Sequence, residues 1–469
     1  MFQRAALAGL LCLAAAAEAQ QMFPATLAGH AILPAKTFVA APKDAPESLR
    51  ISGKYTAPDL RRRDEPESIP GTSYLSDRSA PRPTGVSLPF RGQLVQGFSG
   101  IKSMKDGSYM VLTDNGYGSK ANSADAMLMF HHLRLDWKSG SVKLLRTVFL
   151  HDPERKVPFG IVNEGTKKRY LTGADFDIES IQFVGKSVWL GDELGPYLIE
   201  TDFSGRVLGV HETMLDGRVL RSPDHFAITT PAVPGAFTTP VRRSRGYEGM
   251  AASKDGPFLY PLLEGPLWNE TEKKWEAKDG REFLRILEFD AAKRQWTGRS
   301  WKYLLEANGK NIGDFNMIDA DTGLIIERDK GEGVPEEACN GPARPDCQNV
   351  PAKMKHVYKV SLADADADGF VKKIGYIDLL AIGDPNGVAR RGRTAQGTFT
   401  FPFVTIEDVD VVDDDHIIVA NDKNLPYSSG RKVGVQDDNE FILLRVPELL
   451  RARARRPRRS RPGRRSRPR

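Results

Sequence analysis

Short runs of β-branched and aromatic residues, separated by turn residues, recur along most of the chain. Five segments share one pattern: a short strand with a Ser, an acid or an amide near its start, a turn, and a second apolar strand that ends in acids or amides. The turns contain Asp-Gly, Gly-Lys, Asp-Thr-Gly or Asp-Asp, and apolar strands split by such turns are typical of β-hairpins. The five segments are 97–116, 177–196, 246–266, 312–331 and 405–426.

Two more apolar strands follow the second, third and fourth of these hairpins, as in YLIETDF and RVLGVHETML after the second. Four-stranded units repeated along a chain are typical of propeller blades. We therefore expect an all-β fold, a β-propeller with five or six four-stranded blades. Successive repeats start 66 to 93 residues apart, more than the roughly 40–45 residues of a minimal blade, so long loops should lie on one face.

The last repeat has only one clear further strand, at 440–446. A closed ring would take the missing outer strand from the N-terminal region, where 35–40 and 50–55 are the candidates. Closure of this kind removes the sheet edges that would otherwise template aggregation. A pair of β-sandwiches whose repeats are similar by chance is the alternative.

The two ends of the chain differ in composition from its body. Arg4 precedes an apolar run at 5–17, and Ala17-Glu18-Ala19 is a small-x-small cleavage pattern. This combination is typical of a secretory signal peptide, and no later apolar run is long enough to span a membrane. We expect a signal peptide at 1–19, a single domain at 20–450 and a disordered Arg-rich tail at 451–469, in a protein that is periplasmic or secreted.

The formal net charge of +6 is misleading, because the segment 451–469 alone holds eleven arginines and no acid. The rest of the chain is mildly acidic, and the tail has no interleaved aromatic residues. Charge therefore does not indicate a nucleic-acid partner. We expect a small-molecule substrate, no nucleic acid, no membrane span and a monomeric protein.

The two cysteines that remain after signal cleavage lie in ACNGPARPDCQN, as Cys339 and Cys347. A short loop rich in Gly, Pro and Asn between two cysteines of an exported protein predicts a disulfide. A zinc site is the alternative, but no nearby His or second Cys pair favours it.

Aligned repeats place acids at equivalent positions, which a ring of blades would bring together at its axis. Near the start of the first strands lie Ser99, Glu179, Glu248, Asn316 and Glu407. At the ends of the second strands lie Asp114, Asp192, Glu193, Glu264, Glu327, Asp329 and Asp422. Carboxylates this close need a cation or a proton, and an oxygen-only set favours a hard divalent metal, Ca²⁺ before Mg²⁺ or Mn²⁺. Acids that only cap strand ends and bind turn amides are the alternative.

Several of the same segments carry a family resemblance. TDNGYGSK (113–120), DIESI (177–181), GDELGPYL (191–198), GYEGMA (246–251), ERDKG (327–331), IEDV (406–409) and NDKNLPYSSGR (421–431) resemble the phytase-like esterase family of bacterial exported proteins, over roughly 35–446. The resemblance implies a propeller and the hydrolysis of ester or phosphoester bonds. The positions that it implies at the functional surface are Asp114, Glu179, Asp192, Glu248, Glu327, Glu407, Asn421 and Asp422.

The leading hypothesis is an exported metal-dependent hydrolase of phosphate esters or related esters. Its metal, most simply Ca²⁺, would be held by Asp114, Glu179, Asp192, Glu248, Glu407 and Asp422. Glu193 or Glu327 would act as the general base. Lys423 and Arg431, with Asn421, would bind the substrate, since a guanidinium or an ammonium suits phosphate oxygens.

Two other functions remain open. A calcium-dependent lactonase or carboxylesterase on a similar propeller would hold its metal with Glu248, Asn316, Asn421 and Asp422. A non-catalytic propeller would bind a protein or a glycan and use metal only for stability. A serine hydrolase is disfavoured, because Gly97-Phe98-Ser99-Gly100-Ile101 lacks the last glycine of G-x-S-x-G.

Overall fold

The computed structural model describes residues 20–73, 81–229 and 239–454. Within these residues the fold is all-β with almost no helix, as predicted: one α-helix, α1 (Pro447–Arg451), and two 3₁₀ turns, η1 (Glu47–Arg50) and η2 (Pro335–Glu337). The predicted signal peptide at 1–19 and residues 455–469 of the predicted tail lie outside the described residues. No helix in the described part is long and apolar enough to cross a membrane.

Most strands belong to five antiparallel units, numbered here along the chain. Unit 1 is β9 (Phe98–Ser103), β10 (Tyr109–Thr113), β11 (Met129–Asp136) and β12 (Ser141–Phe149). Unit 2 is β13 (Ile178–Val184), β14 (Ser187–Asp192), β15 (Tyr197–Thr201) and β16 (Val207–Glu212). Unit 3 is β19 (Tyr247–Ala252), β20 (Phe258–Leu263), β24 (Arg281–Asp290) and β25 (Gln295–Leu304).

The last two units follow the same order of strands. Unit 4 is β26 (Asn311–Met317), β27 (Thr322–Arg328), β28 (Lys355–Ser361) and β29 (Lys372–Asp378). Unit 5 is β32 (Ile406–Val411), β33 (His416–Asn421), β34 (Asn439–Arg445) and β2 (Thr26–Leu33). All five units begin at the repeats that the sequence predicts.

The fourth strand of unit 5 comes from the N-terminal region, as expected, but from another segment. β2 pairs antiparallel with β34, and its Leu27, Ala31 and Leu33 are buried. The two predicted candidates pair elsewhere: β3 (Phe38–Val39) with β8 (Gln93–Leu94), and β4 (Ile51–Ser52) with β7 (Phe90–Arg91). The prediction of 35–40 or 50–55 is therefore wrong, because the eight-residue β2 offers the longer run of buried positions.

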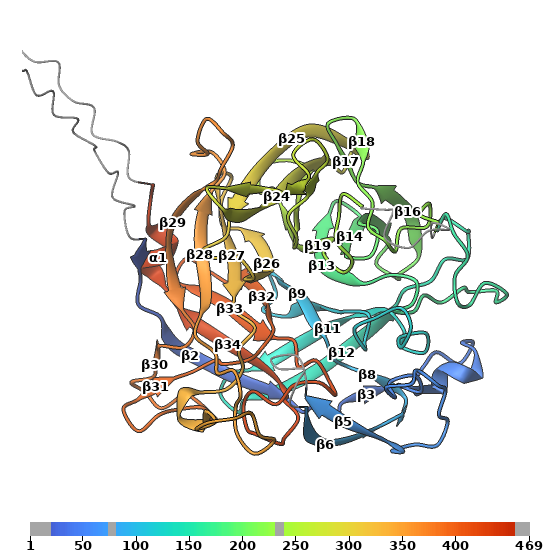
Figure 1. Ribbon diagram of the computed structural model, residues 1–469, viewed down its shortest axis with the longest axis horizontal. Coiled ribbons are helices and arrows are strands. Elements are labelled where there is room, and N and C mark those ends of the chain that lie inside the picture. Colours follow the sequence, from blue (N-terminus) through green and yellow to red (C-terminus); the bar gives the residue numbers. More distant parts are fainter. Residues whose placement is uncertain (1–19, 74–80, 230–238, 455–469) are drawn as a thin grey trace, which may run out of the picture.

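The first strands of the five units form a ring around one axis. β9 contacts β13, β13 contacts β19, β19 contacts β26, β26 contacts β32, and β32 contacts β9 again. Figure 1 shows these five strands gathered at the middle of the molecule, with the outer strands radiating from them. Residues that lie hundreds of positions apart in sequence thus become neighbours at the axis.

Apolar side chains fill the space between neighbouring units. Five buried clusters each join two adjacent units. Phe98 of unit 1 packs on Phe441 of unit 5 with ring centroids 5.7 Å apart, and Trp189 of unit 2 packs on Phe289 of unit 3 at 5.4 Å. Burial of each such ring stabilises the fold by about 1.5–3 kcal/mol. The core therefore lies between the units, and the axis is left to polar side chains.

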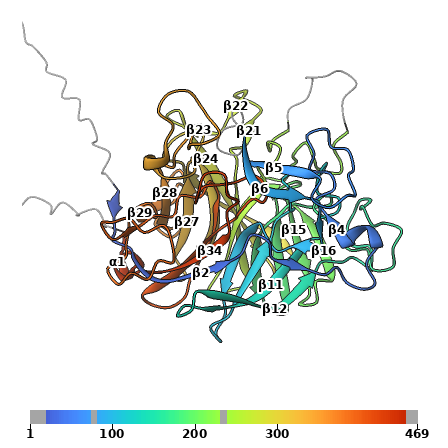
Figure 2. The ribbon, with the colours of Figure 1, turned by 90° about the horizontal axis from the view of Figure 1, so that it is seen from below.

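Shorter elements decorate the ring. β1 (Gln21–Met22) pairs with β29, and the remaining strands are β5 (Ile69–Ser73), β6 (Arg82–Leu88), β17 (Met214–Leu215), β18 (Arg218–Val219), β21 (Trp268–Asn269), β22 (Lys274–Trp275), β23 (Ala277–Lys278), β30 (Ile382–Gly383) and β31 (Thr398–Phe399). Figure 2 shows the hairpins β5–β6 and β21–β22 on the same side of the ring.

Two predictions outside the ring can be compared with the structure. Cys339 and Cys347 form the predicted disulfide, with Cα atoms 5.0 Å apart. The predicted disordered tail starts at Arg451, but Arg451 ends α1 and forms an ion pair with Asp415, and Arg453 pairs with Asp319. The first residues of that segment therefore pack against units 4 and 5.

Candidate functional site

Each of the five first strands carries a β-bulge at the same place near its start. The pairing with the second strand shifts directly after Phe98, Ile178, Tyr247, Ile312 and Ile406. A bulge adds an unpaired residue and re-aims its side chain. The residues that follow the paired positions are Ser99, Glu179, Glu248, Gly313 and Glu407. Three of the five units therefore place a glutamate at the bulge.

The second strands end at matching positions. The partners of the five residues before the bulges are Thr113, Asp192, Leu263, Glu327 and Asn421. The next residues along the chain are Asp114, Glu193, Glu264, Arg328 and Asp422. Four units thus place an acid here, and unit 4 places an arginine.

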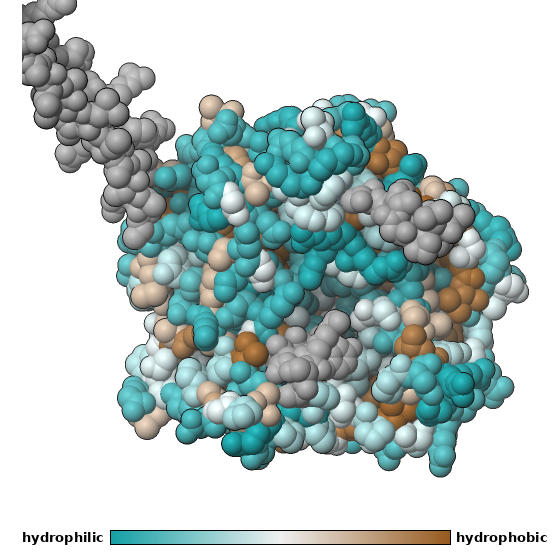
Figure 3. Space-filling view, in the orientation of Figure 1, coloured by the Kyte–Doolittle hydropathy of each residue, from teal (hydrophilic) through white to brown (hydrophobic). Residues whose placement is uncertain are grey.

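The three bulge glutamates and all five residues at the ends of the second strands meet at one cavity of about 260 Å³ at the axis, whereas Ser99 and Gly313 are not among its described lining residues. Eight carboxylates line it: Asp114, Asp177, Glu179, Glu193, Glu248, Glu264, Glu407 and Asp422. Three cations line it as well: Arg245, Arg328 and Lys330. Figure 3 shows that the face seen in that view is covered mostly by hydrophilic residues, with small scattered hydrophobic patches. With eight carboxylates against three cations, the cavity at the axis is a predominantly acidic site.

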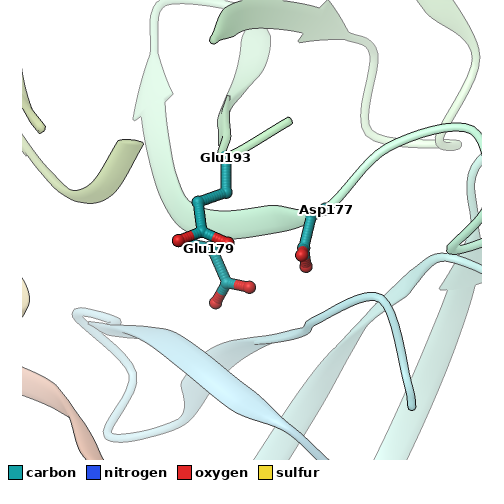
Figure 4. Close-up of side chains that lie close together, drawn as sticks. All are labelled: Asp177, Glu179 and Glu193. Atoms are coloured by element: carbon teal, nitrogen blue, oxygen red, sulfur yellow. The ribbon is translucent and has the colours of Figure 1, made fainter. Parts of the chain in front are cut away.

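Two groups of three carboxylates lie close enough to share a cation. Oxygen atoms of Asp177, Glu179 and Glu193 lie within 4.8 Å of one another, and the same holds for Glu193, Glu248 and Glu264. Figure 4 shows the first three side chains turned toward a common space. Glu193 belongs to both groups. Carboxylates in this arrangement repel one another unless a cation or protons neutralise them.

The titration of these acids reflects that repulsion. Burial raises the pKa of Glu179 well above its ordinary value, and the charge of Asp177 raises it further. Burial likewise raises the pKa of Glu248, with an added contribution from Glu264. The pKa values of Asp114, Glu193 and Asp422 are raised in the same way, by burial first and neighbouring carboxylates second. When no cation is bound, burial and mutual repulsion therefore disfavour the charged forms of these groups.

Two arginines neutralise part of the cluster. Arg328 forms an ion pair with Glu407 and lies 3.7 Å from Glu248. Arg245 forms an ion pair with Glu264. Although burial acts to raise it, the pKa of Glu264 is lowered, because the charges of Arg245 and Arg328 outweigh the burial. The described ion pairs of these two arginines do not include Asp177, Glu179 or Glu193.

The donors present fit a hard divalent cation. The two groups contain only carboxylate oxygens, and the described residues lining the cavity include no His or Cys. Glu248 Oε1 is buried without a hydrogen-bond partner, and its side chain is only 7% exposed. Ca²⁺ takes six to eight oxygen ligands and suits such a set, whereas zinc prefers imidazole or thiolate. The residues therefore fit the metal that the sequence predicts.

The structure brings together five of the six predicted metal ligands. Asp114, Glu179, Glu248, Glu407 and Asp422 all line the cavity, as does the predicted base Glu193.

Asp192, the sixth predicted ligand, is not among the described residues that line the cavity. Its fully buried carboxylate accepts hydrogen bonds from the backbone N–H groups of Asp177 at 2.9 Å and Gly195 at 2.6 Å. The strand alternation that points Glu193 toward the axis points Asp192 behind it. Asp192 therefore holds the backbone of Asp177 in place rather than facing a ligand.

Glu327, the other predicted base, lies on the far side of its strand from the axis. Its carboxylate accepts hydrogen bonds from Tyr303 Oη at 2.7 Å, Lys373 Nζ at 2.8 Å and the backbone N–H of Glu306 at 2.7 Å. Successive residues of a strand point to opposite faces, so Arg328, the next residue, faces the cavity instead. The structure does not support Glu327 as a catalytic residue.

The three predicted substrate-binding residues are engaged elsewhere in the fold. Lys423 is buried and its Nζ donates to the backbone oxygens of Ala35 at 2.5 Å and Val95 at 2.9 Å, and burial lowers its pKa to about 7. Arg431 donates to both carboxylate oxygens of Glu440, at 3.0 and 2.6 Å. Within the described part of the chain, neither residue lines the cavity. In this structure both side chains hold segments of the chain together, away from the cavity.

Asn421 is also structural. Its amide nitrogen donates to the backbone oxygen of Asp438 at 3.1 Å, and its amide oxygen accepts the N–H of Glu440 at 2.7 Å. The lactonase-type set is therefore incomplete at the cavity. Of its four residues, Glu248 and Asp422 line the cavity, while Asn316 accepts hydrogen bonds from Lys102 at 2.6 Å and Gln182 at 2.8 Å.

Among the charged and amide residues of the site, sequence reasoning missed Asp177, Arg245, Asn311, Arg328 and Lys330, among others. Asp177 stands two positions before Glu179 in DIESI, and strand alternation along ERD would have placed Arg328 rather than its acidic neighbours at the axis. Asn311 donates to Glu264 at 2.6 Å. Arg245 lies in a loop that precedes β19, and no pattern in the sequence marks it.

Three known proteins are similar to parts of the chain. A protein of the fungus Arthroderma benhamiae described as an "Uncharacterized secreted protein" is 30% identical over 111 residues, which cover 22% of this chain and 21% of that protein. The match thus spans about a fifth of the relative's length. A putative 6-phosphogluconolactonase of Bacteroides fragilis is 13% identical, with a TM-score of 0.28 over 76% of this chain and 86% of its own. The PQQ-bound aldose sugar dehydrogenase of Streptomyces coelicolor is 11% identical, with a TM-score of 0.31 over 76% and 95%.

A structural similarity with TM-scores of 0.28 and 0.31 assigns neither a fold nor a function to this chain. A family model gives a firmer result, because it matches residues 93–425, which include every carboxylate that lines the cavity. The chain belongs to the Phytase-like family, described as "Esterase-like activity of phytase".

Proposed function

We propose that this protein is an exported, metal-dependent hydrolase of phosphate esters or related esters. The observation that carries the proposal is the meeting of eight carboxylates from all units but unit 4 in one cavity at the axis. Family membership supports ester hydrolysis as the reaction class. The disulfide and the secreted relative support export to the periplasm or the medium.

We also propose a specific propeller architecture for the fold. The five four-stranded units and the ring of their first strands support a five-bladed propeller that forms one domain at 20–450. β2 would close the ring by completing the last blade. In that arrangement the cavity lies at the mouth of the central channel, where propellers can collect side chains from every blade.

Asp177, Glu179 and Glu193 are the residues that would hold a divalent cation, most simply Ca²⁺. When bound, the cation would neutralise anionic substrate oxygens and lower the pKa of a coordinated water. The chain would supply the proton acceptor. Of the two bases predicted from sequence only Glu193 lines the cavity, and Glu248, whose Oε1 has no hydrogen-bond partner, is a second candidate.

The cations of the cavity favour an anionic substrate. Arg245 and Arg328 are partly buried or buried beside the acids, and guanidinium groups match phosphate oxygens in a bidentate way. A phosphate ester entering an acidic cavity needs such groups, together with the metal, to offset the repulsion by the carboxylates. A neutral lactone does not need them.

The proposal is tested by activity with and without metal. Purified protein would be assayed on p-nitrophenyl phosphate, phytate, carboxylic esters and lactones, after chelation and after addition of Ca²⁺. We expect phosphate-ester cleavage that chelation abolishes and Ca²⁺ restores, and at least a hundredfold loss in Glu193→Gln. Asp368→Asn, at an exposed position (67% exposed side chain), is the matched control. Cleavage that is indifferent to chelation, or confined to lactones, would contradict the proposal.

A further inference from the structure

The ring of acids around the cavity is interrupted in one unit. At the bulge and at the end of the second strand, units 2, 3 and 5 place two acids each: Glu179 and Glu193, Glu248 and Glu264, Glu407 and Asp422. Unit 4 places Gly313 and Arg328 at the same two positions. Unit 4 thus has a glycine and an arginine at the two positions where units 2, 3 and 5 have acids.

Gly313 is required by close packing. A Cβ atom at this position would lie 2.5 Å from the backbone oxygen of Ile406 and 2.9 Å from the Cα atom of Glu407. Real Cβ atoms do not approach backbone this closely, so a carboxylate at position 313 would force β26 away from β32. The other residue of the bulge, Asp314, is buried and accepts a hydrogen bond from the backbone N–H of Phe315 at 2.7 Å. Neither residue of this bulge is among the described residues that line the cavity, so unit 4 contributes no carboxylate to it.

Arg328 reaches across from unit 4 to the acids of both neighbouring units. Its Nη2 pairs with Glu407 of unit 5 and lies 3.7 Å from Glu248 of unit 3, and its Nη1 donates to the backbone oxygen of Val404 at 3.1 Å. Its side chain is 4% exposed. A guanidinium keeps its charge at every accessible pH, so a positive charge is permanently fixed between Glu248 and Glu407.

The ion pairs described for Arg245 and Arg328 do not include the other three neighbouring acids of the cavity. Asp177, Glu179 and Glu193 lie close together, and the described ion pairs of the cavity arginines go to Glu248, Glu264 and Glu407 instead. Arginine thus neutralises Glu248, Glu264 and Glu407 directly, whereas Asp177 and Glu179 are the acids for which a cation would matter most, together with Glu193, which the two groups share.

We infer that Arg328 occupies the place of a metal ion in the sector between units 3 and 5, and thereby confines divalent-cation binding to the group of Asp177, Glu179 and Glu193. This inference rests on the proposed metal-binding function of the cavity. Removal of the charge would leave Glu248, Glu264 and Glu407 as a second set of carboxylates. Glu248 and Glu264 already lie within ligand distance of Glu193, and Glu407 and Glu248 both lie against the same Arg328 nitrogen.

The test is the number of divalent cations bound per chain, measured by equilibrium dialysis against Ca²⁺ with elemental analysis of the dialysed protein. The proteins compared are the wild type, Arg328→Gln, Arg328→Lys and Arg285→Gln. Arg285 is the matched control, because it pairs with Glu276 in the outer part of unit 3 and does not line the cavity. Circular dichroism and a thermal melt establish that each variant is folded.

We expect Arg328→Gln to bind one more Ca²⁺ per chain than the wild type, and Arg328→Lys and Arg285→Gln to bind the wild-type number. A folded Arg328→Gln with an unchanged number would overturn the inference. If Arg328→Gln folds only with Ca²⁺, the cation has replaced the arginine and the inference stands; if excess Ca²⁺ does not restore folding, it falls.

Ca²⁺ binding by the wild type tests the proposed function separately from the role of Arg328. A wild type that binds no Ca²⁺ contradicts the metal-dependent function, whatever Arg328→Gln does. A wild type that binds Ca²⁺ while Arg328→Gln gains none leaves the function intact and removes only the role assigned to Arg328.

Discussion

The carboxylate of Asp192 accepts the backbone N–H of Asp177 at 2.9 Å. Asp177 carries one of the three carboxylates that would hold a metal, while Asp192 does not face the cavity. The acid at the end of β14 thus fixes the chain just before the bulge of β13. The position of the Asp177 carboxylate is therefore set by a buried hydrogen bond in addition to strand pairing.

Asp192→Ala should weaken both stability and metal binding. The substitution leaves the buried N–H groups of Asp177 and Gly195 without acceptors, which costs about 1–3 kcal/mol for each group. We expect a lower free energy of unfolding in urea and at least a tenfold weaker Ca²⁺ affinity. Asp192→Asn keeps one acceptor and should lie between the two. A loss of stability with unchanged Ca²⁺ affinity would refute the positioning role.

Glu179→Gln should have opposite effects with and without metal. In chelator the substitution removes a buried carboxylate that Asp177 repels, so the free energy of unfolding should rise. In Ca²⁺ it removes a ligand, so stability should fall below that of the wild type. Urea titrations in both conditions measure the two signs. If the substitution changed the free energy of unfolding in the same direction in chelator and in Ca²⁺, Glu179 would not be a metal ligand.

The stability of the metal-free protein should fall as pH rises above about 4.5. Burial and neighbouring charges raise the folded-state pKa values of Glu179 and Glu248 above their ordinary value of 4.5. Between the unfolded and the folded pKa the folded state binds more protons, so the free energy of unfolding decreases with pH in that window. Thermal melts in chelator should show this decrease, and saturating Ca²⁺ should flatten it. A melting temperature that rises over the window in chelator would contradict the charge repulsion inferred for the site.

Arg431→Ala should destabilise the fold without changing substrate binding. Arg431 donates to both oxygens of the buried Glu440, which also contacts Arg391 and His30. Loss of one partner of a buried ion pair costs about 3–5 kcal/mol, and the remaining partners place the expected loss at the lower end of that range. The KM of the folded variant should equal that of the wild type. A raised KM with unchanged stability would instead indicate that Arg431 binds the substrate.

The repeats allowed the sequence to predict the strands and most of the acids. Hairpin turns and apolar alternation located all five units, and three of the glutamates, Glu179, Glu248 and Glu407, follow from their equivalent places near the starts of first strands. In unit 4 the alignment failed. It matched Asn316 to the glutamates, whereas the bulge brings Gly313 to that position.

The errors share a physical cause, the twofold alternation of a strand. Glu327 and Arg328 are adjacent, and so are Asp192 and Glu193, but only the second of each pair faces the cavity. Composition gives no sign of this choice, because acids on either face satisfy the same pattern. Lys423 and Arg431 were misplaced for another reason: their partners, such as Val95 and Glu440, come from distant segments.

The most direct test of the central claim is a crystal structure of the protein soaked with Mn²⁺, with an anomalous difference map calculated at the manganese edge. We predict a peak bound by Asp177, Glu179 and Glu193, and its disappearance in Glu179→Gln crystals treated in the same way. A map without a peak among these three carboxylates, at a Mn²⁺ concentration that labels other sites, would contradict the account.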